Sequence, residues 1–220
     1  MNTNQRRVVL KQIAASALLG SSGIGGLLRD ALANATKPVT PGMYTVKGMV
    51  TINGKPAVPG MAIGAEDSII TGTNSEAIYV IGQDAFLQRA SSTVSFSGAS
   101  ADVMRVFSGK ILSVFGKGSK KLETATATIG IRGTGCYIES EARRVYFCLC
   151  YGVAEVIPLA DTNHVEIIET RYHDHPLYIH ESSRPMMVDA PVMNHSDQEL
   201  KLLESLVGRW PPFSQDTYRY

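Results

Sequence analysis

Three cysteines and a group of histidines in the second half of the chain are the residues best equipped for chemistry. Cys148 and Cys150 are separated by one residue in a segment predicted to be a β-strand. Because alternate side chains of a strand point to the same face, both thiols should project together, with Phe147, Leu149 and Tyr151 on the opposite face. Two sulfur atoms on one face could share a soft metal ion.

Histidines that follow this strand could complete such a site. The candidates are His173, His175, His180 and His195. The first two form a His-x-His pair around Asp174, whose carboxylate could orient either ring. With Cys136 expected nearby across the sheet, a Cys/His site for zinc, copper or iron is conceivable. The metal ligands we select are Cys136, Cys148, Cys150, His173 and His175.

The same residues also have structural interpretations. Cys136 could form a disulfide with Cys148 or Cys150, or all three could be buried thiols that behave as small hydrophobic side chains. A redox-active thiol is a further alternative, and a histidine-rich turn is often only a solvated loop. We favour structural cysteines and no cofactor, and we keep a bound metal ion as the alternative.

Sequence motifs of enzymes are absent. The chain has no Gly-x-Ser-x-Gly elbow and no His-Glu-x-x-His pair. The GKGSKK run at 116–121 lacks the spacing of a phosphate-binding loop and is expected to join two strands. The sequence therefore favours a protein that is not an enzyme.

The N-terminal segment has the pattern of a twin-arginine export signal. Arg6 and Arg7 stand in the run QRRVVLK at 5–11, ahead of an apolar stretch diluted by glycine and serine. Small residues offer two cleavage frames, after Ala33 or after Ala35. We expect residues 1–35 to be a cleaved signal peptide and the protein to be exported to the periplasm. There, an odd number of cysteines leaves at least one thiol outside any intramolecular disulfide.

Composition excludes two classes of partner. The chain has 21 Lys and Arg residues against 20 Asp and Glu residues, a formal net charge of +1. Such a balance provides neither the basic stripe that nucleic acid requires nor a polybasic patch for anionic lipid. The apolar stretch near the N-terminus is too polar and too interrupted to span a membrane. An envelope protein or a cell-wall glycan is a better candidate partner, and we expect no membrane span in the mature form.

Short apolar or alternating segments separated by turn residues predict a mainly β fold. Asn53-Gly54 predicts a tight hairpin between strands at 46–52 and 57–63. A second hairpin is predicted about Gly152, between 146–151 and 154–159. Residues 161–220 are expected to form an extended tail that contains histidines and ends in a helix, which begins at the capping box of Ser196 and Glu199, ends at Gly208 and packs on the β domain.

Four motifs along the β region resemble the FecR domain family. They are SIITGTNS at 68–75, DAFL at 84–87, SGKILSVF at 108–115 and TATATIGIRGT at 124–134. The resemblance covers about 65–152, and its most specific element is Arg132, Gly133 and Thr134. It implies a periplasmic, twisted β-solenoid-like or sandwich-like domain at 36–160 that binds or senses. It does not imply iron-citrate signalling, because an export leader stands where full regulators carry a cytoplasmic segment and a membrane helix.

Arg132 lies between glycines, where we expect a structural salt bridge or a clamp on backbone carbonyls, and Gly133 should allow a close approach of backbones. Taken together, the sequence predicts an exported, non-enzymatic binding, sensing or scaffold module of the cell envelope. The alternative is a metal-binding or redox protein with a Cys/His site.

Overall fold

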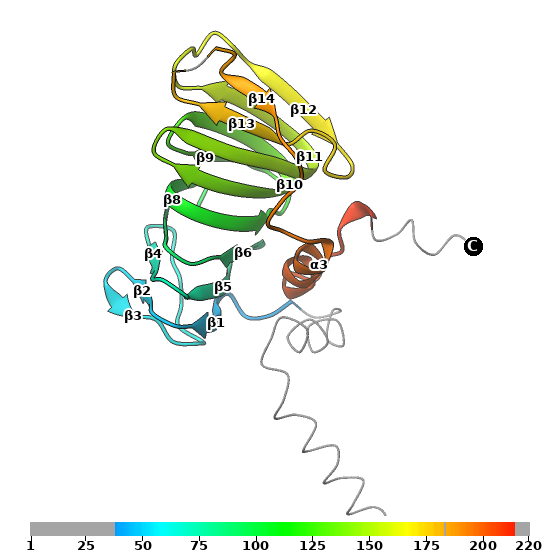
Figure 1. Cartoon of the computed structure of the whole chain (residues 1–220). Coiled ribbons are helices and arrows are strands. Elements are labelled where there is room, and N and C mark those ends of the chain that lie inside the picture. The colour runs from blue at the N-terminus through cyan, green and yellow to red at the C-terminus, as the bar shows by residue number, and fades with distance from the viewer. Residues whose placement is uncertain (1–37, 183, 214–220) are drawn as a thin grey trace, which may run out of the picture.

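The computed structural model describes residues 38–182 and 184–213, which form a mainly β fold (Figure 1). The export leader predicted at 1–35 lies outside the described residues. None of the described helices is long and apolar enough to cross a membrane. The elements are β1 (Gly42–Lys47), β2 (Val50–Ile52), β3 (Lys55–Pro56), β4 (Ser68–Thr71), β5 (Glu76–Ile81), β6 (Asp84–Gln88), β7 (Ser92–Ser97), β8 (Val103–Val114), β9 (Ser119–Glu123), β10 (Ala127–Glu141), β11 (Arg144–Pro158), β12 (Glu166–Thr170), β13 (Leu177–His180), β14 (Met187–Asp189) and α3 (Asp197–Leu206).

All of these strands belong to one open sheet, and its long strands hold it together. The first part of β8 pairs with β7 and, in parallel, with β9, whereas its second part pairs with β6 and β10. Strand β10 likewise pairs with β9 through its first part and with β8 through its second part, and β11 runs beside both parts. Each long strand therefore connects two regions of the sheet.

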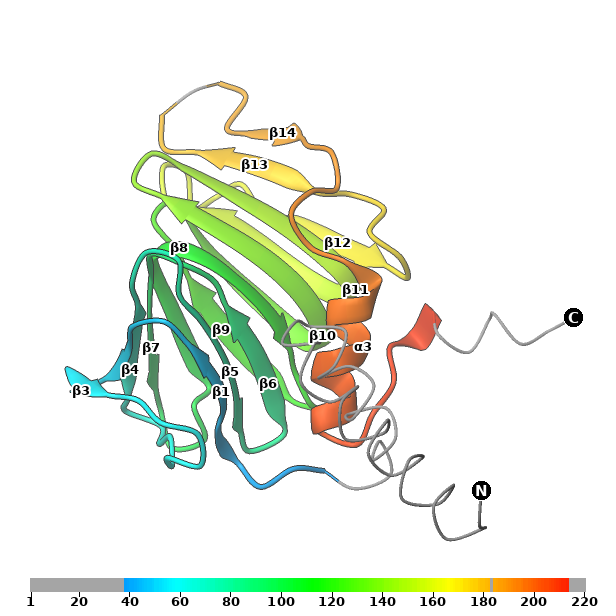
Figure 2. The ribbon, with the colours of Figure 1, turned by 60° about the horizontal axis from the view of Figure 1, so that its bottom comes forward.

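Two apolar clusters lie on opposite faces of the long strands. The larger cluster contains Phe86, Ile111 and Leu149, all buried. The second cluster contains Leu112 and Cys148, and the helix α3 covers it with Leu200, Leu202, Leu203 and Leu206. Figure 2 shows α3 lying across one face of the sheet. Because each buried apolar side chain contributes roughly 1.5–3 kcal/mol, both faces of the long strands stabilise the fold.

Local sequence signals predicted several elements correctly. The mainly β character and the short C-terminal helix are both present. Asn53 and Gly54 have φ values of 51° and 76° in the turn between β2 and β3, as a primed turn requires. At the start of α3, the Ser196 side chain accepts a hydrogen bond from the backbone of Glu199, and the Glu199 side chain accepts one from the backbone of Ser196. These contacts form the predicted capping box.

The predicted hairpin about Gly152 is wrong. Residues 144–158 form the single strand β11, and its hairpin with β10 turns at 142–143. Gly152 has a φ of 103° and lies against Thr134 of β10, so it marks an irregularity inside a pair of strands. The strand predicted at 57–63 is also wrong, because after Asn53-Gly54 only Lys55–Pro56 pairs with β2.

The C-terminal region is more regular than an extended tail. Strands β12 and β13 both pair with β11, and β14 pairs with β13. The segment between β14 and α3 then crosses the second apolar cluster, which includes Ala190 and Met193 at its margin. This path brings His195 close to the cysteines of β11.

Candidate metal centre

Cys148 and Cys150 lie fully buried on one face of β11. Both belong to the apolar cluster under α3, whereas Phe147 and Leu149 belong to the cluster on the opposite face. The alternation predicted from the sequence is therefore confirmed for these four residues. Tyr151 departs from it and lies on the cysteine face, because the pairing register shifts on either side of Gly135, its partner on β10.

Cys136 does not join the other two cysteines. It pairs with Leu149 across the strands and belongs to the apolar cluster on the opposite face of the sheet. All three cysteines are free thiols, so the disulfide considered for Cys136 is not formed. Burial raises the pKa of Cys136 far above its ordinary value, with a smaller contribution from Cys148. Its surroundings are those of an inert, buried thiol.

Two histidines complete a compact cluster with Cys148 and Cys150. His173 Nδ1 lies 3.4 Å from Cys148 Sγ, and His195 Nε2 lies 3.1 Å from His173 Nδ1. The four ligand atoms of these residues lie within 4.8 Å of one another. His173 is held by its own backbone, whose φ is 49° and whose N–H donates to the carbonyl of Cys150 at 3.1 Å.

Each ring has an acceptor at its outward nitrogen. His173 Nε2 lies 3.3 Å from Asp197 Oδ1, and His195 Nδ1 lies 2.7 Å from the carbonyl oxygen of Met193. Because a carboxylate and a carbonyl can only accept, the hydrogens belong on the outward nitrogens. The inward nitrogens, which face the cysteines, are then free to present lone pairs to a cation.

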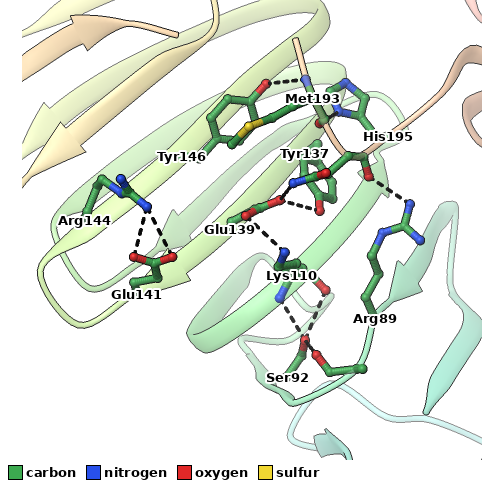
Figure 3. Close-up of polar contacts among 12 residues, drawn as sticks. Arg89, Ser92, Lys110, Tyr137, Glu139, Glu141, Arg144, Tyr146, Met193 and His195 are labelled. Carbon is green, nitrogen blue, oxygen red and sulfur yellow. Dashed lines mark hydrogen bonds and ion pairs between the residues drawn. The ribbon is translucent and has the colours of Figure 1, made fainter. Parts of the chain in front are cut away.

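A polar network holds the segment that carries His195 (Figure 3). The ring of Tyr137 stacks on His195 with centroids 4.8 Å apart, and Tyr137 Oη donates to Glu139 at 2.9 Å. Asn194 Nδ2 also donates to Glu139, at 2.7 Å, and Arg89 Nη2 donates to the Asn194 carbonyl at 3.0 Å. These contacts anchor the segment beside His195 to the central strands.

The electrostatics of the cluster favour a thiolate at Cys148. Interactions with the Cys150 thiol, and then with the rings of His173 and His195, lower the pKa of Cys148 to about 4 and outweigh the opposing effect of burial. Burial raises the pKa of Cys150 well above its ordinary value. Burial also works to lower the pKa of His173, but contacts with Cys148 and Asp197 outweigh it and raise that pKa. Thiolate and neutral imidazole are the forms that bind a metal ion.

Two histidines of the sequence analysis lie outside this cluster. His175 Nε2 contacts Glu166 at 3.1 Å and its Nδ1 contacts Asp189 at 3.4 Å, and 42% of its side chain is exposed. His180, at the end of β13, faces the ring of Tyr178. Sequence reasoning placed His195 among the histidine candidates without selecting it, and it did not identify Asp197. Their position beside the capping box gave no indication that the tail returns to β11.

Arg132, Gly133 and Thr134 are not part of the cluster formed by Cys148, Cys150, His173 and His195. Arg132 is exposed, and its side chain makes no hydrogen bond or ion pair with another described residue, so no salt bridge or carbonyl clamp is seen there in the described part of the chain. Gly133 has a φ of 54° and its added Cβ would meet nothing closer than 4.0 Å, so conformation and not crowding favours glycine there. Thr134 is buried, and its hydroxyl has no partner among the described residues.

Comparisons with known proteins leave the family open. No family model matches the chain, and no curated protein matches it. Two crystal structures of a protein described as a putative anti-sigma factor from Parabacteroides distasonis ATCC 8503 are similar, each with 10% sequence identity and a TM-score of 0.46. Each match covers 56% of this chain and 58% of the other. At this level of similarity, function must be argued from the site itself.

Proposed function

We propose that this protein binds a metal ion, with zinc as the preferred ion, through Cys148, Cys150, His173 and His195. The observation that supports it is the convergence of four ligand atoms within 4.8 Å. Zinc bonds of about 2.3 Å to sulfur and 2.0–2.1 Å to nitrogen separate neighbouring tetrahedral ligands by roughly 3.3–3.8 Å. The separations of 3.1 Å and 3.4 Å around His173 Nδ1 lie close to that range.

The ligand set favours a structural or sensing site over a catalytic one. Two cysteines and two histidines occupy all four coordination positions of a tetrahedral zinc ion, whereas a catalytic zinc ion keeps one position open for water or substrate. Both sulfur atoms are fully buried, which limits access for a substrate. Asp197 and the Met193 carbonyl fix the two rings from outside, as acceptors do around many zinc sites. The proposal is therefore a non-enzymatic, metal-binding β protein.

We further propose that this protein works in the periplasm as a FecR-like binding, sensing or scaffold module. The support is the twin-arginine pattern at 5–11 and the FecR-like motifs between 65 and 152. Export in the folded state suits a protein that acquires its metal before translocation. Fractionation of expressing cells tests this part separately: the periplasmic fraction should contain the chain, and replacing Arg6 and Arg7 with lysine should retain it in the cytoplasm.

Elemental analysis of the purified full chain tests the metal site. We expect about one zinc ion per chain, lost in the Cys148→Ser, Cys150→Ser double variant. Substitution with cobalt should give the absorption of a tetrahedral thiolate complex, because two sulfur ligands donate charge to the ion.

Cys136→Ser is the matched control, since this buried thiol lies on the opposite face of the sheet. It should retain the full metal content and the same cobalt spectrum. Substoichiometric metal in the native chain after zinc is supplied, or equal loss in the Cys136 variant, would refute the proposed site.

A further inference from the structure

The four proposed ligands come from two parts of the molecule that join at this site. Cys148 and Cys150 belong to β11, and His173 lies in the turn that follows β12. His195, in contrast, belongs to the segment that leads directly into α3. Asp197, the first residue of α3, contacts His173 Nε2 at 3.3 Å and accepts a hydrogen bond from Tyr172 Oη at 2.9 Å. An ion at this site therefore bonds the sheet to the start of the helix.

The helix itself depends on contacts with the sheet. It has only ten residues, a length that is marginal for an isolated helix in water. Its leucines are buried against an apolar face on the strands, made by Ile78, Val80, Ala85, Leu87, Leu112 and Val114. Polar contacts add to this packing, because Arg89 pairs with Glu199 at 2.7 Å and the Leu206 carbonyl accepts from the backbone of Val39 at 2.9 Å.

The metal site lies at the N-terminal end of this docked helix, because its ligand His195 precedes the first helical residue, Asp197. The chain between β14 and α3 has no strand of its own, and its residues Pro191 and Met193 contact Tyr146 of β11. Fixing His195 to the two cysteines adds to the hydrogen bonds that already hold this segment, and so further reduces the freedom of the chain that must be ordered when α3 docks. When the metal is bound, the segment is already ordered, so the docking of α3 no longer carries the entropic cost of ordering it.

We infer that metal binding and the docking of α3 are reciprocally coupled, so that loss of the ion loosens the helix and uncovers the apolar face beneath it. This inference rests on the proposed metal-binding function and adds a regulatory consequence to it. A ligand that favours the docked state stabilises it by its difference in affinity for the two states. Reciprocally, undocking of the helix lowers the affinity of the site for the metal ion, because His195 then leaves the ligand set.

Hydrogen exchange of the full chain, loaded with zinc or stripped by a chelator, tests the coupling. We expect the amides of 200–206 to exchange about tenfold faster without metal, a change within the usual range of coupling between sites. The amides of β8 and β10 should exchange at unchanged rates. Unchanged exchange in α3, or equal acceleration in α3 and the central strands, would overturn the coupling.

The reciprocal measurement uses zinc affinity. Leu203→Ala removes a buried contact of the helix and should weaken zinc binding by about tenfold, since the docked state loses stability. Leu122→Ala, in the apolar cluster on the other face, creates a comparable defect and should leave zinc affinity unchanged. Should Leu203→Ala fail to fold, Val207→Ala provides a milder change, since Val207 packs at the margin of the same cluster.

The two proposals fail in different ways. A native chain that binds no zinc after reconstitution refutes the metal site and with it the coupling. A native chain that binds one zinc ion, but whose helix exchanges equally with and without it, refutes the coupling alone. Equal loss of zinc affinity in Leu203→Ala and Leu122→Ala also refutes the coupling, because both variants then act through general destabilisation.

Discussion

At the scale of single residues, the outer contacts of the two histidines explain why this cluster suits a cation. Asp197 and the Met193 carbonyl accept hydrogen bonds, so the hydrogens of the rings are directed outward. The inward nitrogens then face each other at 3.1 Å beside the Cys148 sulfur. Two facing lone pairs repel unless a proton or a metal ion lies between them. Asp197 is therefore a positioning residue for the proposed site, although it is not a ligand.

The role of Asp197 is testable by substitution. Asp197→Ala should weaken zinc binding by about 10–100-fold, the usual cost of removing an acceptor behind a histidine ligand. Asp197→Asn keeps an acceptor oxygen and should retain more affinity. A competition titration with a chromogenic chelator measures both values, and the cobalt spectrum reports whether the ligand geometry has changed.

Asp189→Ala is the control for Asp197, because Asp189 contacts the ring of His175, which lies outside the cluster. It should bind zinc with native affinity. A cobalt spectrum and a zinc affinity in Asp197→Ala equal to those of the native chain would contradict the positioning role.

At the scale of elements, β11 shows where sequence patterns succeed and fail. Strand alternation predicted that Cys148 and Cys150 share a face, because side-chain direction depends only on neighbours in the sequence. Gly152 was wrongly predicted to turn a hairpin, since glycine marks both turns and irregular strand positions. The deciding feature is Thr134, which is distant in the sequence and packs against Gly152.

The same distinction applies to the helix and the site. The capping box of Ser196 and Glu199 is a local pattern, and it predicted the start of α3 correctly. The participation of His195 depends instead on the path of the chain from β14 to α3 across β11, and no local pattern encodes that path. Sequence reasoning therefore selected Cys148, Cys150 and His173, but it also selected Cys136 and His175, which lie outside the cluster, and it left out His195.

The importance of Gly152 for β11 can be measured. A strained backbone position by itself costs about 1–3 kcal/mol. Gly152→Ala should lower the free energy of unfolding by more than this, because the residue has a φ of 103° and the new Cβ would also lie 2.5 Å from the Thr134 side chain. Denaturant unfolding of the metal-free chain measures this loss.

Gly82→Ala separates conformation from crowding. Gly82 also has a positive φ, of 59°, but an added Cβ there meets nothing within 4 Å. We expect it to cost only about 1–2 kcal/mol, the price of a left-handed residue. If Gly152→Ala costs no more than Gly82→Ala, the close approach to Thr134 has no energetic importance.

At the scale of the whole molecule, both faces of the central strands are buried, one under other strands and one under α3. The helix closes its face with a polar cluster as well as with leucines. Glu204 is buried there, accepts a hydrogen bond from Tyr151 Oη, and pairs with Arg209 Nε at 2.6 Å. Arg209 also donates to the Gln83 carbonyl at 2.7 Å, which ties the end of the helix to the turn between β5 and β6.

This cluster predicts how the stability of the chain depends on pH. Burial raises the pKa of Glu204, and it outweighs the opposing attraction of Arg209 and the hydrogen bond from Tyr151. A carboxyl group with a raised pKa in the folded state stabilises the fold most below its unfolded pKa, and that contribution falls as pH rises through the folded value. Glu204→Gln removes this titration while keeping an acceptor for Tyr151.

Urea midpoints of the native chain and of Glu204→Gln, measured with chelator between pH 4 and pH 8, test this dependence. Because the two proteins differ only at residue 204, the difference between the two midpoints reports the contribution of Glu204. We expect the native chain to lose stability relative to the variant as pH rises. A difference that grows in favour of the native chain would mean that the pair with Arg209 outweighs the cost of burying the charge, so that α3 is held by an ion pair at neutral pH.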